Sequence, residues 1–326
     1  MRAFRSLLLL ASVAAAAVAL PAGAQEGHEA IEGPSSGVER VDIITPHFTD
    51  SHFIEFPSIF PPFATEVCIG RHVSEHECAP LWEPVHIAGY TVNLSPTKHV
   101  VMLLIAAVLV SLLLIGTAQV HKRHTHEAGH PKGFAAGIEA MVLYMRNEVI
   151  LPNVGHHGNA FVPFLLTTFF FILTANLLGL VPYGSTATGN IAVTATLALI
   201  TFAVVEIAGM RALGTGYLST LFYWNNDLPL VMRVPMFLIM SPVEMIGKLT
   251  KPFALAIRLF ANMTAGHIVV LAFIGLIFTF ASPVSTAPFL MAVAIMLLEI
   301  FVAFLQAFIF TLLASVFIGL IRESHH

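Results

Sequence analysis

Long apolar stretches recur along the chain from about residue 100 onward, and they constrain its fold more than any other feature. About 20 consecutive apolar residues are enough for a helix to cross the hydrocarbon core of a bilayer. Six stretches approach or exceed that length, at about 100–118, 161–181, 191–209, 218–240, 253–281 and 288–321. The sequence therefore predicts an all-α integral membrane protein with about five transmembrane helices.

The composition supports this class and excludes others. Of the 326 residues, 57% are hydrophobic and only 10% are charged, whereas a soluble domain carries about 25% charged residues. So little polar surface cannot coat a particle in water, which excludes an ordinary soluble enzyme and a disordered chain. The net charge of -4 gives no reason to expect nucleic acid as a partner.

Residues 1–24 have the pattern of a secretory signal peptide. Arg2 and Arg5 supply a positive start, an apolar stretch follows, and Ala22-Gly-Ala24 is a small-residue cleavage site. The alternative is a first transmembrane helix that is retained. Because the apolar stretch is short for a span, we favour cleavage after Ala24.

A cleaved signal would leave residues 25–98 as an extracytoplasmic extension and 99–326 as the transmembrane domain. The extension is polar and acidic, and it holds both cysteines, Cys68 and Cys78. In an oxidising compartment their separation suits a disulfide. Two histidines lie between them, but the resulting spacing fits no zinc pattern, so we favour the disulfide over a metal site.

Basic residues orient the spans, because Lys and Arg collect on the cytoplasmic side of a membrane. Lys122 and Arg123 follow the first stretch, and Arg211 follows the third. The N-terminus is therefore expected outside and 119–160 inside. Arg322 then ends the chain on the cytoplasmic side.

The later stretches are not expected to be upright spans. Polar residues between Asn225 and Arg233 interrupt 218–240, which predicts an interfacial or broken helical segment on the cytoplasmic side. Residues 288–321 as one helix would extend about 51 Å, against a hydrocarbon core of about 30 Å. We therefore expect 253–281 and 288–321 to form two long, strongly tilted helices joined outside.

Few strongly polar side chains lie in these last two stretches. An arginine near mid-membrane costs about 2.5–3.5 kcal/mol on insertion scales, so intramembrane ionisable groups mark function by default. A snorkelling arginine at a helix end is the structural alternative. The polar residues are Arg258, Asn262, His267, Glu299 and Gln306.

Helical geometry divides these residues between two faces. Arg258 and Asn262 are four residues apart and share a face, while His267 points away from Arg258. Glu299 lies on the next helix, which runs antiparallel to the first. Counted from the turn between the helices, His267 and Glu299 reach a similar depth, so we expect them to approach one another.

The residue types indicate proton transfer. Arginine stays protonated, so Arg258 can act only as a fixed charge that makes a nearby carboxylate release its proton. Histidine and glutamate can gain and lose protons near neutrality once their pKa is perturbed, so we expect His267 and Glu299 to form a proton entry path on the outer side. Glu244 and Lys248 precede the arginine and are candidates to line an inner access route.

Four segments resemble the motifs of subunit a of F-type ATP synthases. The first is Ser241–His267, which contains the run RLFANM, and the second is Leu305–Phe310, which reads LQAFIF. Asn176–Pro182 and Thr188–Thr194 are similar to further motifs of that family. The resemblance covers about 97–326, and RLFANM paired with QAFIF is highly specific.

The resemblance implies a stationary proton-channel subunit beside a rotating ring of c subunits. It implies that Arg258 faces the ring carboxylates and separates two offset half-channels. Some relatives exchange the histidine and the acid that here are His267 and Glu299. By resemblance Glu244 lies near the inner path, and the outer half-channel is lined by Asn262, His267, Glu299 and Gln306.

The same resemblance implies a bacterial inner-membrane protein whose partners are the c-subunit ring, the b-subunit peripheral stalk and the rest of the ATP synthase. No phosphate-binding loop is present in the sequence, so we expect no catalysis by this chain alone. We expect no cofactor and no metal site. The alternative function is a stand-alone proton-coupled secondary transporter, but the internal repeats usual in transporters are not visible.

Overall fold

The computed structural model describes most of the chain from residue 97 onward and short segments before it. The signal peptide predicted over 1–24 lies outside the described residues. Those residues are 53–57, 64–69, 71–74, 77–79, 81–82, 85–87, 90–92, 97–124, 133–155, 158–181, 186–217, 229–279 and 284–323.

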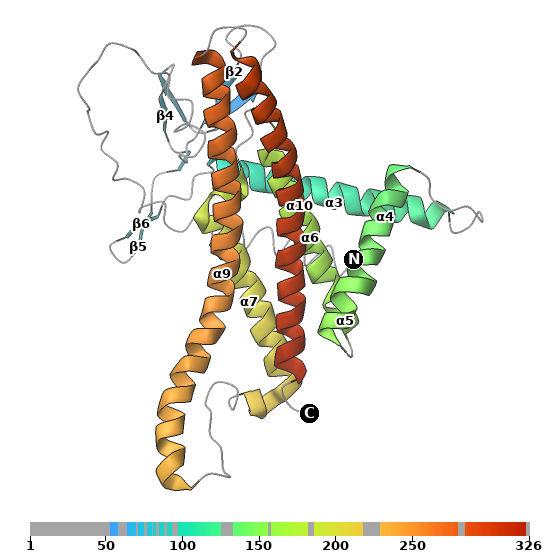
Figure 1. Ribbon diagram of the computed structural model, residues 1–326, viewed down its shortest axis with the longest axis vertical. Helices are drawn as coiled ribbons and strands as arrows, with labels where there is room; N and C mark the ends of the chain where they lie inside the picture. The colour runs from blue at the N-terminus through green and yellow to red at the C-terminus, as the bar shows by residue number, and fades with distance from the viewer. Residues whose placement is uncertain are drawn as a thin grey trace. The chain divides into compact units, whose positions relative to one another are not determined.

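Among the described residues, five helices are long and apolar enough to cross a membrane, which confirms the predicted class. The first three match the predicted single spans, and the last two are the longest helices of the chain (Figure 1). They are α3 (Lys98–His124), α6 (Val162–Gly179), α7 (Ile191–Leu213), α9 (Leu230–Thr279) and α10 (Thr286–Glu323).

The described part of the stretch 218–240 differs from the prediction. Residues 230–240 are the first turns of α9, which continues through Pro235, Pro242 and Pro252. Each proline removes one helical hydrogen bond, but an unravelled backbone would leave several polar groups unsatisfied in lipid. The helix therefore persists, and of the predicted alternatives, an interfacial or a broken segment, the break is wrong for residues 230–240.

The two last helices exceed the thickness of a membrane. The apolar part of α9, Val234–Ile277, has 44 residues, or about 66 Å at 1.5 Å per residue. Because the hydrocarbon core is about 30 Å thick, this helix must be steeply inclined or extend beyond the core. Helix α10 is one unbroken element from Thr286 to Glu323, as the absence of an internal turn signal predicted.

Short elements fill regions that the hydropathy pattern left without structure. Within 119–160, the predicted inner loop, the chain forms α4 (Phe134–Tyr144), the π-helical turn η2 (Met145–Ile150), α5 (Leu151–Val154) and η3 (Gly158–Ala160). Two further single turns are η4 (Ala187–Gly189) and η5 (Gly214–Gly216).

The described parts of the N-terminal extension form antiparallel hairpins. Strand β1 (Phe53–Pro57) pairs with β2 (Ala64–Cys68), β3 (Arg71–Ser74) with β4 (Glu77–Ala79), and β5 (Val85–Ile87) with β6 (Tyr90–Val92). Cys68 at the end of β2 is disulfide-bonded, and Cys78 is the only other cysteine of the sequence.

The chain divides into two compact units, each assembled from distant segments. The first unit contains residues 1–113, 170–193 and 259–306, and the second contains the remaining segments, 114–169, 194–258 and 307–326. Helices α9 and α10 are each divided between the two units, α9 after Arg258 and α10 after Gln306.

A hydrophobic cluster holds the second unit together. It brings side chains of α5, α6 and α7 against the C-terminal turns of α10. Gly319 allows the closest approach, because a Cβ at this position would overlap the carbonyl oxygen of Asn153. The buried members are Ile150, Val154, Val162, Leu165, Val205, Ala208, Ala314 and Ile318.

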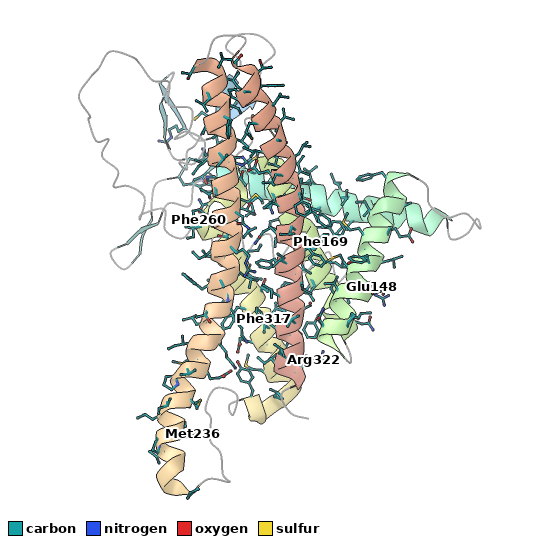
Figure 2. The ribbon with its side chains drawn as sticks, in the orientation of Figure 1. Glu148, Phe169, Met236, Phe260, Phe317 and Arg322 are labelled. Atoms are coloured by element: carbon teal, nitrogen blue, oxygen red, sulfur yellow. The ribbon has the colours of Figure 1, made fainter. Side chains whose placement is uncertain are left out.

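Arg322 joins the end of α10 to the same unit. Its guanidinium donates a 3.2 Å hydrogen bond to the carbonyl of Val154 and lies 5.6 Å from the ring centre of Phe161. Figure 2 labels Arg322 near the end of α10, and Phe317 earlier on the same helix. This arginine therefore has a structural role in holding the helix end.

Candidate functional site

The first unit places His267 between an acid and a hydroxyl. Its Nδ1 lies 3.2 Å from Oε1 of Glu299 on α10, and its Nε2 lies 3.1 Å from the hydroxyl oxygen of Thr186. Glu299 is only 3% exposed. The predicted approach of His267 and Glu299 is therefore confirmed. Together with the Thr186 hydroxyl they form a row of three polar groups, called the polar row below.

Gly266 makes this contact sterically possible. It precedes His267 on α9, and a Cβ at this position would overlap Oε1 of Glu299 and lie 2.9 Å from Cγ and Cδ of that side chain. The absence of a side chain at Gly266 thus lets the buried carboxyl group lie directly against α9, within reach of the imidazole.

A second polar contact joins the same two helices. The side-chain amide of Asn262 donates a 2.9 Å hydrogen bond to Oε1 of Gln306. Gln306 is 1% exposed, whereas Asn262 is exposed. The hydrogen bond therefore connects the buried amide of Gln306 on α10 with Asn262 on the exposed face of α9.

A third polar contact attaches α6 to α10. The side chain of Asn176 donates to the backbone carbonyl of Ala303 at 3.3 Å and accepts a 2.7 Å hydrogen bond from the hydroxyl of Thr188. Both side chains are buried. In an apolar core an unpaired amide would cost about 1–3 kcal/mol, so these bonds fix the position of α6 beside the polar row.

The row of polar groups can exchange protons. A histidine between a hydroxyl and a carboxyl group can accept a proton at one ring nitrogen and release one from the other. Asn262 and Gln306 cannot titrate, but their amides can orient water or a neighbouring group. Within the described part of the chain, no group of three or more metal-ligating side chains is present.

Arg258 lies in the second unit, near the middle of the span Val234–Ile277. Its side chain is exposed among exposed apolar side chains such as Phe253 and Ile257. No hydrogen bond or ion pair joins it to another described residue. An arginine left unpaired in lipid would be costly.

The surface around this arginine is available to a partner subunit. In the most apolar part of the α9 span only 6% of residues are buried within the chain, and in that of α10 only 17%. The corresponding share in α6 is 61%. In these most apolar windows, few residues of α9 and α10 are therefore buried against the rest of the described chain.

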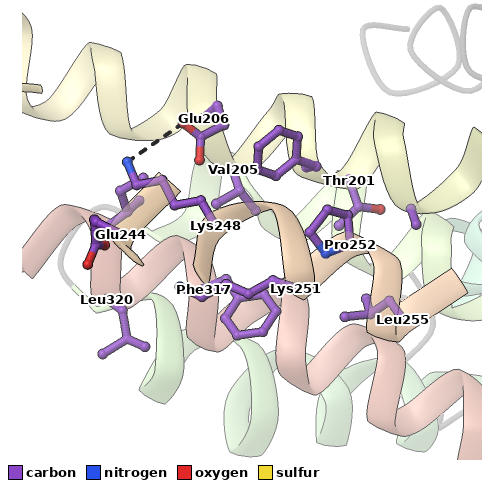
Figure 3. Close-up of a pocket in the computed structure, with 13 residues that line it drawn as sticks. Thr201, Val205, Glu206, Glu244, Lys248, Lys251, Pro252, Leu255, Phe317 and Leu320 are labelled. Atoms are coloured by element: carbon purple, nitrogen blue, oxygen red, sulfur yellow. Dashed lines mark ion pairs between the residues drawn. The ribbon is translucent and has the colours of Figure 1, made fainter. Parts of the chain in front are cut away.

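A pocket of about 170 Å³, lined by charged and apolar side chains, lies between α7, α9 and α10 within the second unit (Figure 3). Glu206 of α7 and Glu244, Lys248 and Lys251 of α9 line it, with apolar side chains of α10 closing one side. Oε2 of Glu206 lies 4.0 Å from Nζ of Lys248. The structure thus brings Glu244 and Lys248, the two candidates for an inner access route, to one pocket.

Five polar residues of these clusters are absent from the predicted site: Asn176, Thr186, Thr188, Glu206 and Lys251. Glu206 carries a sequence signal, because it is an acidic residue inside an otherwise apolar span. Asn176 and Thr188 occur in motifs of the family resemblance. Thr186 carries no such signal, because threonine is common in loops and only the fold places its hydroxyl beside His267.

Comparisons with known proteins agree with this architecture. Residues 100–319 match the family profile described as ATP synthase A chain. The chain is 50% identical to "ATP synthase subunit a" of Chloroherpeton thalassium over 241 residues, covering 72% of this chain and 68% of the relative. The corresponding protein of Anaeromyxobacter dehalogenans is 41% identical over 317 residues, covering 95% and 76% of the two chains.

A third relative is covered over almost its whole length. "ATP synthase subunit a" of Myxococcus xanthus is 42% identical over 293 residues, which are 88% of this chain and 91% of the relative. Family profile, identity and coverage agree with the five apolar helices. The chain therefore belongs to the ATP synthase subunit a family, a membrane-sector component of the synthase rather than a catalytic subunit.

Proposed function

We propose that this chain is the stationary proton-channel subunit of an F-type ATP synthase. It would form two offset half-channels that load and unload protons on the carboxylates of a rotating c-subunit ring. The observation that carries this proposal is Arg258, a permanent charge near the middle of a span, exposed and without an ion-pair partner among the described residues. A carboxylate on a neighbouring membrane subunit would be its counter-ion.

In this mechanism Arg258 acts by charge alone. It cannot release its own proton, but it stabilises the deprotonated form of a ring carboxylate that passes beside it. Each carboxylate therefore gives up its proton before passing the arginine and is reprotonated afterwards. This step prevents a direct leak between the half-channels and couples proton flow to rotation.

The outer half-channel would use the polar row of the first unit. His267 and Glu299 are in contact and titratable, and Asn262 with Gln306 extends the polar surface along α9 and α10. Protons from outside would pass through these groups towards the ring. One elementary charge crossing 100 mV supplies about 2.3 kcal/mol, which is the energy available to drive rotation.

The inner half-channel would begin at the pocket of the second unit. Glu244 is exposed and lines this pocket, so its carboxylate can exchange protons with water on the cytoplasmic side. This assignment completes the route, because a proton loaded from the outer side must leave the ring through a separate exit.

The proposal includes the placement of the chain. It would lie in a bacterial inner membrane with residues 25–98 outside and the C-terminus in the cytoplasm, after removal of residues 1–24. Its partners would be the c-subunit ring, the b-subunit peripheral stalk and the rest of the ATP synthase. The basic residues that follow the first and third spans support this orientation.

Oxidative cross-linking in the assembled complex tests the docking of the ring. With Cys68 and Cys78 changed to serine, an Ala261→Cys variant places a thiol on the exposed face of α9, three residues from Arg258. A second cysteine is introduced beside the c-subunit carboxylate. We expect a cross-link that blocks ATP-driven proton pumping and is reversed by reduction.

A matched control uses Met263→Cys, since Met263 is 1% exposed on the same helix and should not cross-link. Equal cross-linking at both positions, or none at Ala261→Cys in a pumping complex, would contradict the proposal. The alternative of a stand-alone transporter requires the purified chain alone to carry proton-coupled flux in vesicles. We expect no such flux without the ring.

A further inference from the structure

The pocket between α7, α9 and α10 contains more charged groups than a proton exit needs. A single carboxylate, Glu244, would suffice to pass protons to water. Glu206 and Lys248 add one negative and one positive charge, at a separation of 4.0 Å. Glu206 lies inside the apolar span of α7, where an ionised side chain is expensive to maintain.

The geometry places Lys248 between two acids. Glu244 and Lys248 are four residues apart on α9 and therefore share a face. Figure 3 shows the Lys248 side chain extending towards Glu206 on α7, with Glu244 one turn earlier on α9. Lys248 is only 8% exposed, and its Nζ lies 4.6 Å from the ring centre of Tyr217. The Lys248 ammonium group is therefore held in the pocket and is not exposed to bulk solvent.

The remaining groups around Glu244 define the charge balance. Helix α7 contributes Glu206, and α9 contributes Lys248 and Lys251. Lys251 lies 5.0 Å above the ring of Phe317, which directs its charge towards α10. The pocket-lining residues of α10 are Phe317, Leu320 and Ile321 and carry no charge. The pocket thus contains two acids and two bases.

We propose that Glu206 and Lys248 form an internal counter-ion pair whose function is to set the proton affinity of Glu244. Both are positioning residues in this assignment, and only Glu244 exchanges the transported proton. The proposal rests on the proton-channel function above. Its physical basis is that charges inside a partly enclosed pocket interact more strongly than charges in water.

The two halves of the pair act on Glu244 with opposite signs. Removing Glu206 takes away one negative charge beside Lys248, so the lysine would act more strongly on Glu244, which would retain its proton only at lower pH. Removing Lys248 leaves a second carboxylate beside Glu244, so the proton would be retained to higher pH. Removing both charges should restore the original balance.

The test measures ATP-driven proton pumping by the assembled complex in inside-out vesicles, where the medium contacts the cytoplasmic side. The pH of the medium is varied, and the pH of half-maximal pumping is determined. We expect Glu206→Gln to lower this pH and Lys248→Gln to raise it, each by about 0.5–1 unit. The double variant Glu206→Gln/Lys248→Gln should return it to within about 0.2 units of the unmodified complex.

Thr250→Val is the matched control on the same helix. The Thr250 hydroxyl is exposed and donates a 2.9 Å hydrogen bond to the carbonyl of Gly247 on its own helix. This variant should leave the pH of half-maximal pumping unchanged. Assembly of each variant is measured by the amount of complex recovered from the membranes.

A purely structural ion pair gives a different pattern. Both single variants would then lower the amount of assembled complex, the pH of half-maximal pumping would not move, and the proposal would be overturned. Shifts of the same sign in both single variants would also overturn it. Where a glutamine variant assembles poorly, Glu206→Asp and Lys248→Arg retain the charges and should keep the original pH dependence.

Failure of the underlying channel function is distinguishable from failure of this proposal. If Glu244→Gln pumps like the unmodified complex at every pH, the inner half-channel assignment itself is wrong. If Glu244→Gln abolishes pumping but the Glu206 and Lys248 variants leave its pH dependence unchanged, only the counter-ion proposal is wrong.

Discussion

The contact between His267 and Glu299 depends on the absence of a side chain at Gly266, which makes Gly266→Ala an informative perturbation. The added methyl would overlap Oε1 of Glu299 and lie 2.9 Å from its Cγ and Cδ. The substitution introduces no charge and favours the helix. Any loss of activity would therefore come from displacement of the carboxyl group.

The size of the effect follows from these distances. Non-bonded carbon atoms prefer about 3.5 Å, so relief of the carbon contacts alone moves the Glu299 side chain by about 0.6 Å, and the overlap at Oε1 requires more. If the movement is directed away from the imidazole, the contact between His267 Nδ1 and Glu299 Oε1, now 3.2 Å, would lengthen to about 3.8 Å or more, beyond hydrogen-bond range. A hydrogen bond to a charged group contributes about 1.5–3 kcal/mol, which corresponds to a fall of about ten- to a hundredfold in the rate of a step that requires it.

The assay is ATP-driven proton pumping by the assembled complex, normalised to the amount of complex. Gly275→Ala is the control, because a Cβ at Gly275 on the same helix meets nothing within 4 Å. In the double variant Gly266→Ala/Glu299→Asp the acid is one methylene shorter, so the overlap is relieved and part of the activity should return. Equal pumping by the Gly266→Ala and Gly275→Ala complexes would refute the reasoning.

Three further predictions follow from the same structure. Thr186→Val removes the hydroxyl beside Nε2 of His267 and should slow pumping about three- to tenfold. Thr186→Ser keeps the hydroxyl and should not slow pumping, so equal rates for the two variants would contradict a role for the hydroxyl. Gly319→Ala would push α10 away from the Asn153 backbone and should lower the free energy of unfolding by about 1–3 kcal/mol. An unchanged denaturation midpoint of the purified chain would exclude this close packing. Because Cys68 is disulfide-bonded, denatured protein should react with a maleimide only after reduction, and full labelling without reduction would disprove the bond.

Hydropathy predicted the membrane class and the single spans because lipid imposes one simple requirement, a long apolar helix. It did not predict that residues 230–240 continue into α9, since Pro235 and Pro242 are ordinary helix-breaking signals. In a membrane a proline is a weaker helix-breaking signal, because ending the helix would leave more backbone groups without hydrogen bonds than the proline itself does. Similarly, α4 and η2 escaped prediction because they lie outside the six longest apolar stretches.

At the candidate site, too, some contacts could be predicted from the sequence and others depend on the fold. Counting residues from the turn between two antiparallel helices was sufficient to bring His267 and Glu299 together. No such count locates Thr186, because it precedes η4 and its position depends on how the chain reaches α7. Glu206 pairs with Lys248 across two helices, and the sequence separation of these residues carries no information about that contact.

The central claim is that Arg258 separates two proton half-channels, and one pair of measurements on Arg258→Ala tests it most directly. In vesicles that contain the assembled complex, ATP-driven proton pumping is compared with passive proton flow under an imposed gradient. We predict that the variant loses ATP-driven pumping while its passive flow is retained or increased, because the barrier between the half-channels is gone. Unchanged ATP-driven pumping would contradict the account and leave Arg258 as a structural residue.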